Sequence, residues 1–352
     1  MPEEDAVAPL TTEQIAAFWR AFSSRLPALE ALDSYAFVEQ ASDLLQDYEP
    51  GLAIELEGEP KTADARLVLT AHGVIAHFEN LQALARHAPP CEPYTVQAFR
   101  SRTLGSGFAM RMQDFDLSCD DVLVGHYDAG GNVGLELSFA KEIPQDMMDH
   151  ARHMAFIMLD HVLGEWDFAV RVGPVDFVDT LSEAQPLSQF VPIFDAFQRD
   201  ALGRSYVYPQ EENDRWSSLE ARPNDADEDD PPDILTFHDS ANALATRADL
   251  SHFLAWRFPI GSQEELDNAR AAQDALEAQL LRQQSGIMAF SRIEGMSSRL
   301  AAFYVTDPVA ATELAGRLAA EHAPAQEADL HVIYDPAWRE YLELYAAIYG
   351  NE

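Results

Sequence analysis

The chain has few cysteines and no long apolar run. Only Cys91 and Cys119 occur among 352 residues, so at most one disulfide could form, and we expect two reduced thiols. No stretch reaches the roughly 18 consecutive apolar residues that a membrane-spanning helix needs. The opening MPEEDAVAPL also lacks the basic and apolar regions of a signal peptide. These absences predict a soluble, cytoplasmic protein.

Basic side chains are scarce as well. Lys+Arg number 23 against 60 for Asp+Glu, which gives a formal net charge of -37. A field of that sign repels phosphate backbones and anionic lipid surfaces, so we expect neither a nucleic acid nor a membrane as partner. A basic protein partner would be attracted. An acidic surface that only keeps the protein in solution would give the same composition.

Sequence signals of catalysis are missing too. There is no Gly-x-Ser-x-Gly elbow and no His-Glu-x-x-His or paired-cysteine motif. Gly105-Ser106-Gly107 precedes an expected strand rather than a helix, so it does not read as a phosphate-binding loop. The sequence predicts no cofactor and favours a protein that is not an enzyme.

The chain does contain enough apolar residues for more than one core. Hydrophobic residues make up 47% of the sequence, and a chain of this length is typical of two domains and a connector. We predict an N-terminal α+β domain over residues 1–182. Residues 183–250 are expected to hold a helix, an acidic loop and strands that connect the domains. A second domain with a terminal helix is expected over residues 251–352.

The first domain shows helical and strand periods in turn. Thr11 and Gln14 have the spacing of a capping box before an amphipathic helix. Alternating segments and glycine turns then predict antiparallel strands. A long helix is expected over residues 145–163, ended by Gly164, followed by a strand over residues 168–178. The class predicted is α+β, with antiparallel sheets and flanking helices.

The connecting segment is the most acidic part of the chain. Residues 211–233 hold ten acidic residues against Arg215 and Arg222. This composition predicts a solvated loop. Its centre, Asp227, Glu228, Asp229 and Asp230, is the first candidate for contact with a basic partner.

The last hundred residues give the clearest pattern. Expected strands cover residues 253–258, 287–293, 299–305 and 329–334. Helices are expected after Ser262 and after Asp307-Pro308, where capping residues stand. The order strand, helix, strand, strand, helix, strand predicts a ferredoxin-like βαββαβ domain.

The same region resembles a known family. Glu264-Glu265 opens a long helix, Phe303-Tyr304 ends a hairpin, and Asp335-Pro336-Ala337-Trp338-Arg339-Glu340-Tyr341 follows the last strand. With these elements, residues 256–345 resemble the bacterial domain-of-unknown-function 695 family. The resemblance implies a fold and no activity. Some members of the family are similar in architecture to small regulatory proteins, so the resemblance also implies a protein-binding role.

Two groups of side chains could form sites on helices. Asp146, His150 and His153, with His161 further along, share one side of the 145–163 helix and could bind a divalent metal. A polar edge on a packed helix is the alternative. Trp338 and Tyr341 begin an aromatic stripe on the terminal helix, which would cover this protein's own sheet or a partner.

The sequence therefore predicts a non-enzymatic binding or regulatory module that engages a basic protein. The alternative is a metal-dependent enzyme that uses the His/Asp group on the 145–163 helix. The sequence does not indicate an oligomeric state.

Overall fold

The computed structural model describes residues 7–62, 64–103, 108–112, 115–181, 183–222 and 231–350. The chain forms two compact units. Unit 1 comprises residues 1–127 and 133–194, and unit 2 comprises residues 128–132 and 195–352. The segment predicted to connect two domains is thus divided between the units, at a point inside helix α5.

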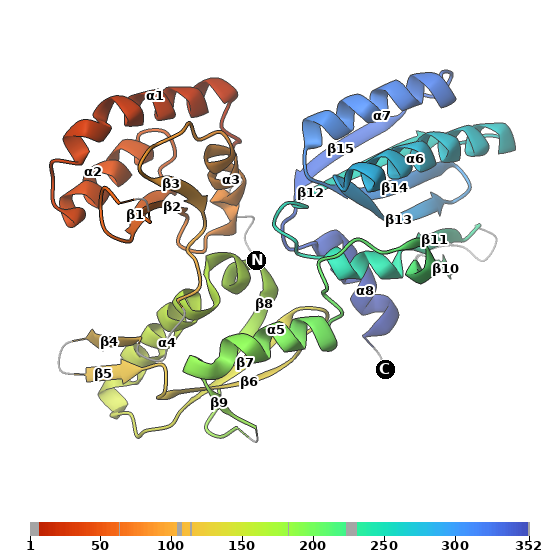
Figure 1. The fold of residues 1–352 in the computed structure, drawn as a ribbon. Helices are drawn as coiled ribbons and strands as arrows, with labels where there is room; N and C mark the ends of the chain where they lie inside the picture. The colour runs from red at the N-terminus through yellow and green to blue at the C-terminus, as the bar shows by residue number, and fades with distance from the viewer. Residues whose placement is uncertain are drawn as a thin grey trace. The chain divides into compact units, whose positions relative to one another are not determined.

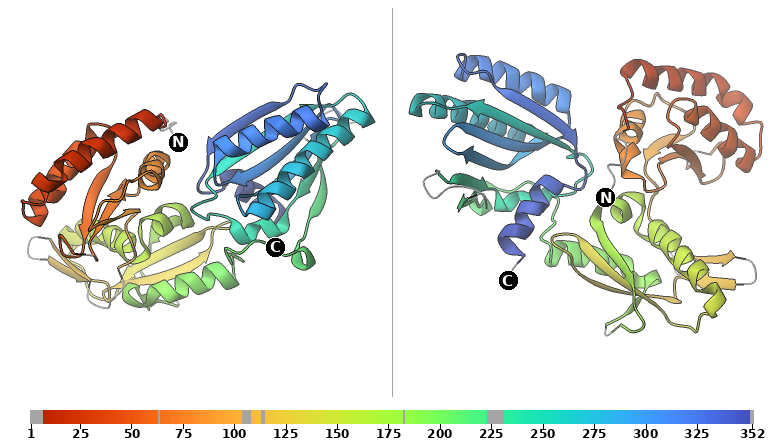
Figure 2. Two further views of the ribbon diagram at one scale, coloured as in Figure 1. Left: turned by 45° about the horizontal axis from the view of Figure 1, so that its top comes forward. Right: turned by 180° about the vertical axis from the view of Figure 1, so that it is seen from behind.

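Unit 1 consists of small sheets with helices beside them (Figures 1 and 2). Its helices are α1 (Thr12–Leu29), α2 (Ser34–Gln46), α3 (Phe78–Arg86), α4 (Met148–Leu163) and the start of α5 (Phe190–Asp200). Its strands are β1 (Ala53–Glu57), β2 (Arg66–Thr70), β3 (Thr95–Ala98), β4 (Ala109–Met112), β5 (Phe115–Ser118), β6 (Val122–Asp128), β7 (Val133–Phe139), β8 (Val172–Phe177) and β9 (Gln185–Pro186). They form sheets in the orders β1-β2-β3, β4-β5 and β8-β7-β6-β9.

The start of unit 1 follows the sequence prediction. Thr11 caps α1, and its side chain and that of Gln14 form the capping box. Phe18, Trp19 and Phe22 are buried on one face of the helix, and the indole N–H of Trp19 donates to the carbonyl of Leu84. The first of the predicted antiparallel strands are the pair β1 and β2.

The strand predicted over residues 168–178 is wrong in its first half. Asp167–Arg171 forms a π-helical turn, and the strand starts only at Val172. Arg171 and Arg102 both form ion pairs with Asp167, and the Arg171 pair spans one helical turn. These charge contacts stabilise the turn where the alternation of apolar residues favoured a strand.

Unit 2 is one six-stranded sheet with helices on both faces (Figures 1 and 2). Its strands are β10 (Ser217–Ala221), β11 (Asp233–Phe237), β12 (His252–Pro259), β13 (Gly286–Glu294), β14 (Ser298–Val305) and β15 (Asp329–Tyr334), in the order β10-β11-β13-β14-β12-β15. Its long helices are α6 (Gln263–Gln283), α7 (Pro308–His322) and α8 (Arg339–Tyr349).

The two faces of this sheet have separate cores. α6 and α7 lie side by side on one face, where Leu254, Trp256 and Phe303 are buried against them. α8 covers the other face and packs against Phe237 and Tyr304. Burial on both faces explains why the central strands β12, β13 and β14 carry apolar residues towards both faces.

The α+β class with antiparallel sheets and flanking helices is confirmed. The order strand, helix, strand, strand, helix, strand runs from β12 to β15, with Ser262 and Asp307 as helix caps. β10 and β11 extend the sheet beyond these four strands, which the sequence patterns did not predict. The assignment to the ferredoxin-like folds stays a prediction. Among the helices described, none is both long and apolar enough to span a membrane.

Candidate functional site

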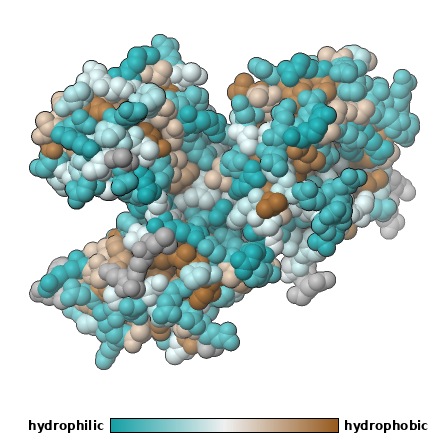
Figure 3. Space-filling model, viewed as in Figure 1, coloured by the Kyte–Doolittle hydropathy of each residue, from teal (hydrophilic) through white to brown (hydrophobic). Residues whose placement is uncertain are grey.

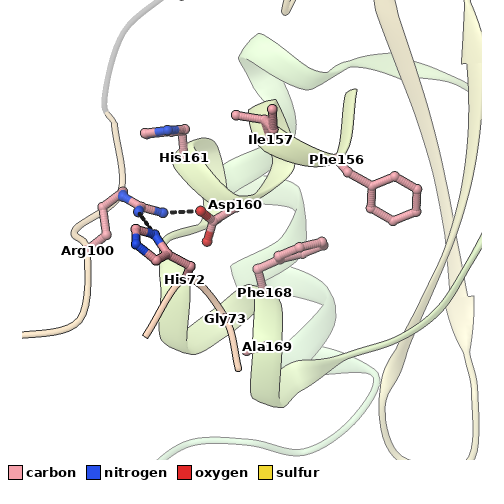
Figure 4. Close-up of a pocket in the computed structure, with 9 residues that line it drawn as sticks. All are labelled: His72, Gly73, Arg100, Phe156, Ile157, Asp160, His161, Phe168 and Ala169. Carbon is pink, nitrogen blue, oxygen red and sulfur yellow. Dashed lines mark hydrogen bonds and ion pairs between the residues drawn. The ribbon is translucent and has the colours of Figure 1, made fainter. Parts of the chain in front are cut away.

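Unit 1 contains a cavity of about 450 Å³ beside α4, here called the arginine cavity (Figure 4). One side is apolar and is formed by Phe156, Ile157, Phe168 and Ala169. The other side is polar and is formed by His72, Arg100, Asp160 and His161, with Gly73 beside them. Cavities of this size with an apolar wall and a few polar groups are the usual form of small-molecule sites.

Arg100 is the centre of the polar side. Its guanidinium donates to both carboxylate oxygens of Glu55, at 3.0 Å from Nε and 2.6 Å from Nη2. Nη1 forms an ion pair with Asp160, and Nη2 lies 3.5 Å from Nδ1 of His72. The Arg100 side chain is 8% exposed, and such a buried cation needs the paired carboxylates because its desolvation is costly.

Behind Arg100 lies a second buried carboxylate, Glu165. One oxygen accepts hydrogen bonds from the backbone N–H groups of Ala71 and Gly73, at 2.8 and 3.0 Å. The other accepts from the N–H of Arg100 at 3.1 Å. Glu165 has no exposed surface. It therefore ties the turn after β2, the segment after β3 and the end of α4 together.

The end of α4 allows this arrangement because residue 164 is glycine. Gly164 has a φ of +81°, and a Cβ there would lie 3.2 Å from the carbonyl oxygen of Arg100. Arg102, which follows Arg100 by two residues, donates from Nε to the carbonyl of Leu163 and to the carboxylate of Asp167. The predicted helix end at Gly164 is confirmed, and the structure adds the reason: the segment after β3 passes close to it.

Burial and the guanidinium shift the pKa values of the cavity side chains. Burial raises the pKa of Asp160, although the Arg100 charge opposes the change. Burial alone would raise the pKa of Glu55, but the hydrogen bonds and charge of Arg100 lower it overall. Burial and then Arg100 lower the pKa of His161. Glu55 therefore stays ionised, and the imidazole of His161 favours its neutral form.

The residues predicted to bind a metal do not converge. Asp146 and His153 are exposed, and His150 is half-buried. Within the described ranges, no group of three or more His, Cys, Asp or Glu side chains is arranged to hold a metal ion. His161, the fourth member of the pattern, lines the arginine cavity instead.

The acidic segment leads into the edge of the unit 2 sheet. Asp227, Glu228, Asp229 and Asp230 lie outside the described residues. Before them, residues 211–221 form a short helical turn and strand β10, and we call this stretch the β10 surface. β10 pairs with β11 on one side and is the last described strand of its sheet. Trp216 and Leu219 are 36% and 37% exposed on this surface.

Trp338 and Tyr341 are core residues and have no exposed surface. Trp338 stacks on Tyr304 with ring centres 3.8 Å apart, and its indole N–H donates to the carbonyl of Leu250. The Tyr341 hydroxyl donates to the carbonyl of His238 at 3.0 Å. The aromatic stripe was expected to cover either the protein's own sheet or a partner. Both of these side chains pack on the protein's own sheet.

Asp335 is the first residue of the Asp-Pro-x-Trp-x-x-Tyr element that also contains Trp338 and Tyr341. Its carboxylate accepts the Tyr304 hydroxyl at 2.6 Å and the backbone N–H groups of Arg339 and Glu340 at 3.0 and 3.3 Å. It thereby satisfies the first N–H groups of α8. The Asp-Pro-x-Trp-x-x-Tyr element is a structural motif that attaches α8 to the sheet.

Sequence reasoning missed Arg100, Glu55, Asp160 and Glu165 as a group. They come from β1, the segment after β3, and the end of α4, so no local spacing connects them. A weak signal exists at Gly164-Glu165-Trp166, where a carboxylate follows a helix-ending glycine between apolar residues. A charged residue in such surroundings is rarely buried without a partner.

No family model, curated protein or solved structure matches this chain. The resemblance to the domain-of-unknown-function 695 family stays a prediction.

Proposed function

We propose that this protein is a non-enzymatic binding module that engages a basic protein partner through the β10 surface and the acidic residues that follow it. One observation carries the proposal: an exposed edge strand lies within the most acidic segment of a chain with a formal net charge of -37. Edge strands offer backbone N–H and C=O groups to another chain, and carboxylates beside them would attract a basic one.

Internal pairing of the basic side chains supports this proposal. Arg66, Arg100, Arg247 and Arg257 each form an ion pair with a carboxylate of the same unit. The excess carboxylates therefore dominate the surface charge, and most of the face seen in Figure 3 is hydrophilic. Such a charge distribution steers a basic partner into contact and makes binding sensitive to salt.

Exposed apolar groups on the β10 surface give the partner something to bury. Glu211, Glu212 and Glu220 are exposed, and the exposed parts of Trp216 and Leu219 lie in the same stretch. Aromatic residues are enriched in protein interfaces, whereas charge alone gives little affinity. We therefore expect an extended basic segment with alternating apolar residues as the bound part of the partner.

A charge-matched pair of variants tests the proposal. The first carries Asp227→Asn, Glu228→Gln, Asp229→Asn and Asp230→Asn in the acidic segment. The control carries Glu264→Gln, Asp267→Asn, Glu313→Gln and Glu321→Gln, at exposed positions on α6 and α7. Both remove four negative charges, so they differ only in where the charge is lost.

Binding would be measured with a fluorescent peptide of alternating lysine and valine, at low and high salt. We expect about tenfold weaker binding for the first variant and little change for the control. Equal weakening in both variants would show that only net charge matters, and the proposed surface would then be wrong. Affinity capture from the native host with the same three proteins would identify a partner that follows the same order.

The proposal extends to the fold and the location. Four adjacent strands in the order β13-β14-β12-β15, with α6 and α7 on one face, support a ferredoxin-like core for unit 2. Cys91 and Cys119 are free and buried, which supports a reducing compartment and hence the cytoplasm.

A further inference from the structure

We propose that the arginine cavity is a binding site for a small organic cation, namely an amine attached to an aromatic or aliphatic body. The site is separate from the β10 surface and does not depend on the function proposed for it. The cavity volume of about 450 Å³ lies in the range that holds small ligands. The two kinds of wall then determine which chemistry the cavity accepts.

The region around the polar side carries more negative than positive charge, although of its charged groups only Asp160 and Arg100 line the cavity. Glu55 and Asp160 contact the Arg100 guanidinium directly, and Glu165 accepts the backbone N–H of the same residue. Two carboxylates thus pair with the guanidinium and a third acts on it through its charge, and the neighbouring His161 favours its neutral form. An anionic ligand would meet this excess of negative charge, whereas an ammonium group would reduce it.

Asp160 is the carboxylate best placed to receive the amine. It lines the cavity, and Figure 4 shows it between Arg100 and Phe168. One of its oxygens pairs with Arg100, while the other, Oδ1, is buried and has no hydrogen-bond partner. A buried acceptor without a donor is costly. A small rotation of the Asp160 carboxylate would turn this oxygen towards the cavity, where a ligand ammonium would supply the donor.

The opposite wall accommodates an apolar body. Phe156 and Phe168 have ring centres 6.4 Å apart, and Ile157 completes this side of the cavity. Phe156 is 37% exposed, so its ring offers apolar surface that a bound ring or chain would remove from water. Aromatic faces also attract organic cations.

Three probes that share a phenylethyl body separate the effect of charge on binding from the effect of shape. Phenethylamine, phenethyl alcohol and 3-phenylpropionate would be titrated into the full chain, with binding followed by calorimetry and by backbone amide shifts in NMR. We expect the amine to bind about tenfold more tightly than the alcohol, and the acid to bind most weakly. Saturable binding should shift amide signals of α4 and of the Asp167–Arg171 turn.

Variants connect the preference to the cavity. Asp160→Asn should remove the preference for the amine, whereas Asp149→Asn should keep it, because Asp149 lies on the same helix with its side chain 98% exposed. Ile157→Trp should fill the cavity and abolish binding of all three probes. This variant also keeps the test valid if Asp160→Asn does not fold. No saturable binding of the amine, equal affinity for the three probes, or binding unaffected by Ile157→Trp would overturn the proposal.

Discussion

The two units bury carboxylates in different ways. In unit 1, Glu165 receives three backbone N–H groups from two segments that precede it by more than sixty positions. In unit 2, two of the three hydrogen bonds to Asp335 come from residues four and five positions later, and the third comes from Tyr304. The polar group in unit 1 therefore connects distant segments, whereas in unit 2 it attaches one helix.

The apolar contacts of the two units differ in the same direction. Unit 2 has one large sheet with a core on each face. The largest described sheet of unit 1 has four strands, and two segments of this unit meet through Glu165 and Arg100. We infer that aromatic packing dominates where α8 meets the sheet of unit 2, whereas buried hydrogen bonds dominate where Glu165 joins the segments of unit 1.

The largest effect is expected from Trp338→Ala in unit 2. The change removes a fully buried ring that stacks on Tyr304, and comparable truncations cost about 3–5 kcal/mol of unfolding free energy. Denaturant unfolding with hydrogen exchange would show which unit is destabilised. Trp338→Phe keeps a ring on Tyr304 and should cost less. If the two variants were equally unstable, the lost hydrogen bond to Leu250 would outweigh the packing.

A smaller effect is expected from Glu165→Gln in unit 1. The amide keeps one acceptor oxygen but places an NH₂ group against a backbone N–H, so we expect a loss of about 2–3 kcal/mol. Glu165→Ala should cost more, because it removes both acceptor oxygens. Hydrogen exchange should become faster at Ala71, Gly73 and Arg100 while unit 2 is unchanged. Unchanged protection of these amides would contradict the role assigned to Glu165.

The smallest effect is expected on the pH dependence of stability, from Glu277, a carboxylate of unit 2 that lies near other negative charges. Burial, with the nearby Asp274 and Asp214, raises the pKa of Glu277 from 4.5 to about 7. Between these values the folded state holds a proton that the unfolded state has lost, so stability falls as pH rises through this window. At pH 8, Glu277→Gln should therefore be more stable than the wild type, by about 1–2 kcal/mol.

The difference between the Glu277→Gln variant and the wild type should shrink as pH falls towards 5. Thermal unfolding at several pH values would measure it. Glu264→Gln, at an exposed position of the same helix, is the control for the loss of one charge. An identical pH profile for the two variants would count against a special environment at Glu277.

Local patterns were sufficient for much of unit 2. The spacing of Ser262 and Glu265 placed the start of α6, and the proline after Asp307 placed the start of α7. β15 has the predicted bounds. α6 ends at Gln283 and β13 begins at Gly286, where glycine is required because a Cβ would lie 2.8 Å from the carbonyl oxygen of Tyr304. Close approach between strands is not visible in a local pattern.

Unit 1 shows where local patterns fail. The strand predicted over residues 168–171 is a helical turn, because ion pairs with Asp167 override the apolar alternation. His161 was grouped with two histidines of its own helix, but the charged groups that shift its pKa include Arg100, which is distant in sequence. Helical spacing predicted on which side of α4 His161 lies. It could not predict that Arg100, from another segment, lies near that side.

The sequence by itself determined the α+β class, the charge, and the starts of α1, α6 and α7, because period, capping and composition act over a few residues. Only the tertiary structure decided that β10 and β11 extend the second sheet, that Trp338 and Tyr341 are core residues, and that Arg100 meets three carboxylates. These outcomes depend on contacts between residues tens of positions apart. Such contacts form only when the whole chain has folded, so no local pattern encodes them.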